Sequence, residues 1–182
     1  MAVMAQRHDE FLERGGRVFA VSADSPGQNS AVVEKLALPF PILSDPDRSQ
    51  AITPLGFADD EDPRQISLPA AVVIDPDGEE AYRFVGRDFA DRPDEGDLLA
   101  ALEGLGLEAT NQDPPARGPA QPGEAALNIR VLEPYFKGGL HAAYALRRRH
   151  RPLEEFADDA KAMMRMLDRY LKALAAVEER RS

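Results

Sequence analysis

A short apolar segment between a proline and a tight turn most constrains how this chain folds. The segment runs from Leu68 to Ile74 and is followed by Asp75-Pro76-Asp77-Gly78. Its valines and isoleucine are β-branched and do not alternate with polar residues, which predicts a strand covered on both faces, as in an α/β sheet. The turn and the following residues 81–85, which are rich in aromatic and β-branched side chains, predict a β-hairpin. Pro69 stands just before the first strand, where proline is tolerated.

Hydrophobic periodicity predicts helices and strands in alternation over the first hundred residues. The predicted helices cover residues 2–14, 28–36, a short stretch ending near 52, and 95–105, and the predicted strands cover residues 18–22 and 38–43 besides the hairpin. Residues 56–65 are polar and predict a loop. This order predicts an α/β domain with a mixed sheet flanked by helices.

The composition changes after residue 107 and predicts a division of the chain. Residues 1–107 form the predicted sheet domain, residues 108–125 are rich in Pro and Gly and predict a linker, and residues 126–182 predict a helical region. Pro134 fits the first turn of a helix that runs toward Arg149, and a second helix is predicted from near Pro152. The second helix carries an apolar seam that consists of Leu153, Phe156, Ala160, Met163, Leu167, Tyr170, Leu174 and Val177. Such a seam predicts lengthwise packing on the preceding helix, on the sheet domain or on a second subunit.

Charge and cysteine content exclude several classes of function. The formal net charge of −10 argues against nucleic acid and anionic membranes as main partners. The basic run Arg147–Arg151 is interpreted as a helix end, where cations are favoured. The chain has no cysteine, which excludes disulfides, thiolate metal sites and thiol chemistry by this chain alone. It also lacks a membrane-spanning apolar stretch and a signal-peptide pattern, so a cytoplasmic protein is predicted.

Four segments in their order resemble the peroxiredoxin-like redoxins, the alkyl hydroperoxide reductase and thiol-specific antioxidant family. They are His8-Asp9-Glu10-Phe11 with Gly15-Gly16, Val18–Pro26, Leu38–Pro46, and Leu68–Asp75. The resemblance covers about residues 5–105 and implies a thioredoxin-like fold. It also implies a cleft at Leu68 and Pro69, with the Leu68–Pro69 bond cis. Members of the family reduce hydroperoxides through a cysteine thiolate, and a thiol reductant protein would be the partner of a longer, cysteine-bearing form.

The sequence departs from this family in ways that limit the functional inference. The family's first core strand and cysteine loop would precede the helix with which this chain starts. The strands matching residues 18–22 and 70–75 would each lose a neighbour. Residues 126–132 are one candidate replacement strand, and a truncated form is the alternative. No catalytic residue is therefore carried over, and the chain is expected to be inactive alone.

The remaining polar residues predict no metal or cofactor site. His8 is placed on the polar side of the first helix, and His141 and His150 lack the spacing of a helical metal pair. The acidic run Asp59–Asp62 is interpreted as a solvated loop. Two functions stay open: an antioxidant redoxin lineage seen without its cysteine, or a non-catalytic thioredoxin-fold binding module. A homodimer through the helical seam is a further hypothesis.

Overall fold

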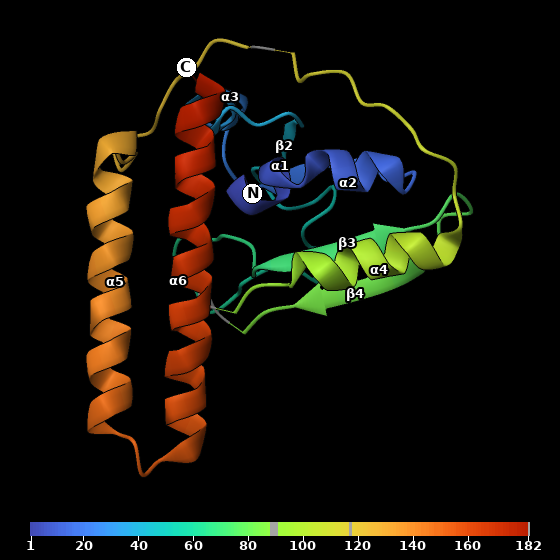
Figure 1. Ribbon diagram of the computed structural model, residues 1–182. Helices are drawn as coiled ribbons and strands as arrows, with labels where there is room; N and C mark the ends of the chain where they lie inside the picture. The colour runs from blue at the N-terminus through green and yellow to red at the C-terminus, as the bar shows by residue number, and fades with distance from the viewer. Residues whose placement is uncertain (88–90, 117, 182) are drawn as a thin grey trace. The chain divides into compact units, whose positions relative to one another are not determined.

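The computed structural model describes residues 1–87, 91–116 and 118–181, and they fall into two compact units (Figure 1). The first unit extends to Gly123 and the second starts at Glu124. Residues 108–123 thus belong to the first unit instead of lying free between the two. Arg117, inside the predicted linker, and Ser182, at the end of the predicted helical region, lie outside the described residues.

The first unit contains short helices and strands in the predicted alternation. Its elements are α1 (Ala2–Gln6), α2 (His8–Glu13), β1 (Ala20–Ser22), α3 (Pro26–Leu36), β2 (Ile42–Ser44), β3 (Ala70–Ile74), β4 (Glu80–Val85) and α4 (Glu95–Leu105). The predicted first helix is interrupted at Arg7, which caps α1 and precedes α2. The mixed α/β class is confirmed.

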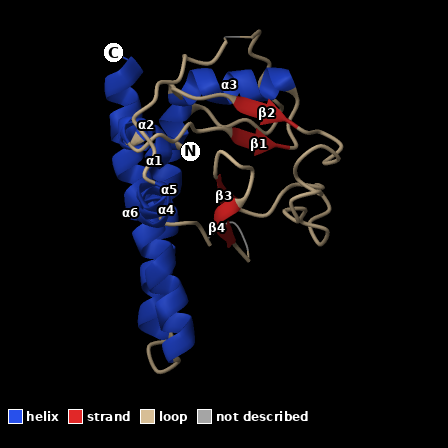
Figure 2. Ribbon diagram, turned by 90° about the vertical axis from the view of Figure 1, so that its right-hand side faces the viewer, coloured by secondary structure: helices blue, strands red, loops and turns tan. Residues whose placement is uncertain are grey.

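The strands form two small sheets instead of one mixed sheet (Figure 2). β1 and β2 are parallel, with Val21 opposite Leu43. β3 and β4 are the predicted antiparallel hairpin, with Val73 opposite Tyr82. Among the described residues, no strand joins β1 to β3.

Local sequence signals explain where α3 and α4 begin and end. Ser25 caps α3 by accepting a hydrogen bond from the Gln28 N–H, and the Gln28 side chain accepts one from the Ser25 N–H. This reciprocal capping box satisfies two backbone donors and lets the helix begin at Pro26, two residues earlier than predicted. Asp94 caps α4, and Gly106 ends it at a φ of 62°.

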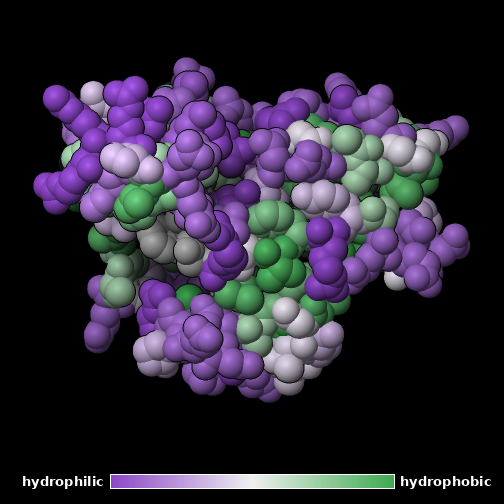
Figure 3. All heavy atoms as spheres, turned by 90° about the horizontal axis from the view of Figure 1, so that it is seen from below, coloured by the Kyte–Doolittle hydropathy of each residue, from purple (hydrophilic) through white to green (hydrophobic). Residues whose placement is uncertain are grey.

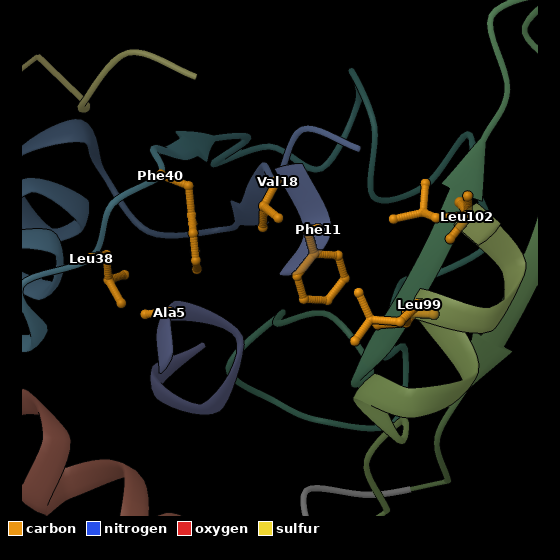
Figure 4. Packing of buried hydrophobic residues seen from close by; sticks show 9 residues of the cluster. Ala5, Phe11, Val18, Leu38, Phe40, Leu99 and Leu102 are labelled. Atoms are coloured by element: carbon orange, nitrogen blue, oxygen red, sulfur yellow. The ribbon is translucent and has the colours of Figure 1, made fainter. Parts of the chain in front are cut away.

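One apolar core holds the first unit together (Figure 4). Phe11 of α2, Leu99 and Leu102 of α4, and Phe40 before β2 are all buried in it, and Phe40 has no exposed surface. Val73 brings β3 into the same cluster. The core therefore connects the two sheets although their strands do not pair.

The loop after β2 differs from the prediction. Residues 46–56 form successive turns instead of a short helix. The buried carboxylate of Asp45 accepts hydrogen bonds from the backbone N–H groups of Gln50, Ala51 and Ile52. Because a side chain satisfies these donors, the loop does not need helical hydrogen bonds to be stable.

The second unit is a hairpin of two long helices, α5 (Ile129–Arg149) and α6 (Glu154–Arg181). Gly139 lies against Leu167, where a Cβ on the glycine would be 3.2 Å from a Leu167 methyl group. The Phe136 and Tyr170 rings pack with their centroids 5.5 Å apart. The sequence left three possible neighbours for the apolar seam of the second helix, and the structure packs the seam on the preceding helix, α5. Leu153 and Phe156, the first two predicted members of the seam, are exposed and do not belong to its buried part.

Two sequence predictions for the second unit are wrong. Pro134 lies inside α5, because Asn128 caps the helix and starts it five residues before the proline. Residues 126–132 do not form a replacement strand, since Ile129–Leu132 make the first turn of α5. The Asn128 side chain accepts a hydrogen bond from the Arg130 N–H, and such a cap favours a helix over a strand.

Candidate functional site

The predicted cleft at Leu68 and Pro69 is the entrance to the β3–β4 hairpin. The Leu68 N–H donates to the Phe57 carbonyl at 2.8 Å, and the Pro69 carbonyl accepts from the Gly86 N–H at 2.7 Å. The Leu68–Pro69 bond is trans, as are all peptide bonds among the described residues, so the cis bond implied by the resemblance is wrong. Trans is the usual form of an X–Pro bond in folded proteins.

Two strand edges next to this entrance carry backbone groups that face away from their partner strands. The Ala20 N–H donates a hydrogen bond to the Pro41 carbonyl, and the Ser22 carbonyl accepts one from the Asp45 N–H. The backbone groups of successive strand residues point to opposite edges, so the N–H and carbonyl of Val21 point away from β2. The Pro69 carbonyl accepts a hydrogen bond from the Gly86 N–H, and the Asp75 N–H donates one to the Glu79 carbonyl. By the same alternation along the strand, the N–H and carbonyl of Val72 point away from β4. Among the described residues no strand pairs with either edge. Such edges are templates for an added strand.

One face of the β1–β2 sheet is apolar and exposed. Ala20 and Ile42 point toward the core, so Val21 and Leu43, their neighbours, point away from it. Phe19, Val21 and Leu43 expose 57%, 39% and 50% of their surface. Parallel strands are normally covered on both faces, which makes this exposure unusual. Figure 3, a view of one side of the molecule, also shows hydrophobic residues among hydrophilic ones at the surface.

A cavity of about 340 Å³ lies at the Phe19 end of this sheet. Its lining combines one guanidinium and one carboxylate with apolar side chains and prolines: Arg17, Phe19, Pro41, Asn111, Gln112, Asp113, Pro114, Pro115 and Ala116. Leu68 and Pro69 are not among them. The lining contains neither a thiol nor a histidine.

Gln112 forms one wall of the cavity and fixes the Pro-rich segment to the first unit. Its side-chain amide donates to the Val18 carbonyl at 2.7 Å and accepts from the Val18 N–H at 2.9 Å. The same Oε1 lies 3.1 Å from Nε2 of His8. Because Oε1 is an acceptor, the proton of His8 is on Nε2 and the ring donates.

His8 is buried and not on the polar side of the first helix, which corrects the sequence-based placement. Its ring packs 5.9 Å from that of Phe40. The break of the helix at Arg7 turns this position inward. Sequence reasoning missed both Gln112 and His8, since they lie 104 positions apart and no local pattern connects them.

A second polar cluster lies where β1 and β2 end. Buried Asn29 of α3 donates to the Ser44 hydroxyl at 2.9 Å and accepts from the Ser22 hydroxyl at 2.8 Å. Each of these polar groups has a partner, so the cluster joins α3 to the ends of both strands. The Ser22 hydroxyl also lies 3.3 Å from a carboxylate oxygen of Asp24. These hydrogen bonds give Ser22 a structural role in holding the strand end against α3.

Two arginines form ion pairs with two of the four residues of the acidic run Asp59–Asp62. Arg64 pairs with Asp62 at 2.6 Å, and Arg48 pairs with Asp60 at 3.3 Å. The hydrogen bonds from the Arg64 side chain lower the pKa of Asp62 to about 2. Across the described part of the chain, no group of three or more His, Asp or Glu side chains is placed to hold a metal ion.

The short parallel pair, the antiparallel hairpin entered through a proline and the flanking helices together define a thioredoxin-like α/β scaffold. Residues 1–82 match the model of the AhpC/TSA family, which confirms the resemblance to the peroxiredoxin-like redoxins. No curated protein matches the chain. Within the described residues, none of the helices is both long and apolar enough to cross a membrane.

Proposed function

We propose that this chain is a redoxin scaffold of the antioxidant AhpC/TSA lineage that does not itself reduce hydroperoxides with thiols. One observation carries the proposal: the 182 residues contain no cysteine. A peroxiredoxin needs a thiolate that peroxide oxidises to a sulfenic acid, and no other side chain replaces that step.

The test is a peroxidase assay of the purified chain. Hydrogen peroxide and an organic hydroperoxide are each incubated with the chain and dithiothreitol, and peroxide consumption is followed. We expect the rate to equal that of a heat-denatured sample. A rate above that control, which persists after metal chelation, would overturn the proposal.

The second function is that of a binding module, and a specific observation favours it. The exposed face of Phe19, Val21 and Leu43 continues into the cavity beside Arg17, and neither is needed for the core of the unit. Exposed apolar patches of this kind mark interaction sites. If a longer, cysteine-bearing form exists, a thiol reductant protein would be its partner.

Intact mass and N-terminal sequencing of the protein from its native cells separate the two functions. A longer product that carries a cysteine would assign peroxidase chemistry to that product. A product that starts at Met1 would favour the binding module. A cytoplasmic location belongs to the same proposal, since the sequence has no cysteine with which to form the disulfides that are typical of secreted proteins. Fractionation of the native cells would test it.

A further inference from the structure

α5 carries an exposed apolar stripe outside its contact with α6. The stripe consists of Val131, Tyr135, Gly138, Ala142 and Leu146. These residues follow one another at intervals of three and four and therefore lie along one side of the helix. Val131, Tyr135 and Leu146 expose 43%, 62% and 41% of their surface.

The stripe is distinct from the seam that packs on α6. Phe136 and Gly139 face Tyr170 and Leu167 and belong to the seam. A Cβ added to Gly138 would meet no atom within 4 Å, so the space above the stripe is open. Charged residues lie on the opposite side of α5, where Lys137 and Glu133 form an ion pair at 2.5 Å. The seam thus accounts for one apolar face of α5, and a second apolar face lies outside the packing of the helical hairpin.

Four of the five residues of the stripe are placed symmetrically about its centre. Val131 and Leu146 are equally far from the point between Gly138 and Gly139, and so are Tyr135 and Ala142. If two copies of α5 cross antiparallel at this point, Tyr135 of each copy meets Ala142 of the other, and Val131 meets Leu146. A twofold interface requires this reciprocity, in which residue i contacts j and j contacts i.

The sizes of the residues fit the same arrangement. The large Tyr135 lies opposite the small Ala142, and glycine occupies the crossing point, where two backbones must approach closely. α5 has 21 residues and is about 31 Å long, so the contact can extend over the whole helix. No charged residue interrupts the stripe between Val131 and Leu146.

We propose that the stripe of α5 binds the same stripe of a second copy of this chain, antiparallel, to form a homodimer. The two hairpins then form a four-helix arrangement in which the α5 helices are central. This interface is independent of the redoxin function, because none of its residues belongs to the first unit.

The first experiment measures the mass of the full chain by sedimentation velocity over a range of concentrations. The wild type is expected to form dimers. Tyr135→Glu is expected to raise the dissociation constant by about tenfold or more, the effect of losing a central anchor. Tyr144→Glu is the matched control, because Tyr144 is also exposed but lies nine residues, or about two and a half turns, further along and so on the opposite side. Circular dichroism of each variant verifies that helicity is retained.

The second experiment uses the absence of cysteine to test the register. Gly138→Cys lies next to the twofold axis and is expected to give a disulfide-linked dimer on mild oxidation at low concentration, whereas Tyr144→Cys is not. A wild type that stays monomeric at all concentrations would overturn the proposal. So would a dimer that survives Tyr135→Glu and is not linked by Gly138→Cys, since another surface would then hold it. Binding of a monomer to anionic lipid vesicles that is lost in Tyr135→Glu would assign the stripe to a membrane surface and also overturn it.

Discussion

The two units of this chain are stabilised in opposite ways. The first unit is built from short elements, and its core joins residues as distant as Phe11 and Leu102. The second unit is built from two long helices connected by a short turn, and its seam joins residues on neighbouring helices. The first therefore depends on contacts between distant segments, which form only when most of the unit is folded, whereas the second depends on local helical structure. A substitution in the core should consequently destabilise more of the first unit than a comparable substitution in the seam destabilises of the second.

The largest expected effect is that of Phe40→Ala in the core of the first unit. Phe40 is fully buried, and truncating a buried phenylalanine costs about 3–5 kcal/mol. We expect a loss of this size in the free energy of unfolding, measured by urea denaturation. Phe19→Ala is the matched control, because Phe19 is 57% exposed and should change little. Equal effects of the two variants would contradict the assignment of the core.

Leu167→Ala tests the second unit by the same chemistry. Leu167 is buried against Gly139 in the seam. Leu167→Ala should lower the free energy of unfolding by an amount near the lower end of the usual ~2–5 kcal/mol, because the helices of a two-helix hairpin can partly close the cavity. Leu153→Ala provides the control, since Leu153 is 59% exposed. Helicity followed by circular dichroism should melt earlier in Leu167→Ala alone. A first unit that melts together with the hairpin would show that the two units unfold as one.

Gln112→Ala tests whether the Pro-rich segment belongs to the first unit. The variant removes two hydrogen bonds to the Val18 backbone and the acceptor of His8, at an expected cost of about 1–3 kcal/mol. Limited proteolysis should then cut within residues 108–123 faster than in the wild type. Gln121→Ala should not have this effect, because Gln121 is attached through its backbone N–H. Unchanged protection in Gln112→Ala would contradict the role of the side chain.

The smallest expected effect is the response of the first unit to acid. Backbone hydrogen bonds from Ile52, Ala51 and Gln50 lower the pKa of Asp45, and Arg64 lowers the pKa of Asp62 to about 2. Because both pKa values are lower in the folded state, the stabilisation is complete above the unfolded value of about 3.9 and is lost as the pH falls through the folded values. The urea midpoint should therefore decrease below about pH 4, and the decrease should be smaller in Asp45→Asn. A midpoint that rises as the pH falls through this range would contradict the assignment.

Local signals in the sequence predicted most of the individual elements. The Asp-Pro-Asp-Gly turn located the hairpin, and the start and end of α4 follow from Asp94 and Gly106. The seam of α6 followed from its apolar spacing. These features depend on residues within a few positions of one another, so a single sequence determines them.

The candidate site was largely beyond the reach of sequence reasoning. The cavity beside Phe19 requires that the segment around Gln112 return to Val18, and neither segment carries a signal of the other. The inward position of His8 depends on the break at Arg7 and on the ring of Phe40. The Leu68–Pro69 bond is trans, the usual form of an X–Pro bond, so the family resemblance misled on this point.

The sequence by itself determined the redoxin resemblance, the absence of cysteine and the type of most elements, because these are properties of composition and of short-range periodicity. Only the tertiary structure decided that the strands form two separate sheets, that residues 108–123 are bound to the first unit, and that α5 keeps an apolar face exposed. The pairing of strands and the exposure of a helix face depend on which distant segments of the chain come into contact. The free energies of such contacts are set by both segments together and cannot be read from the local sequence of either.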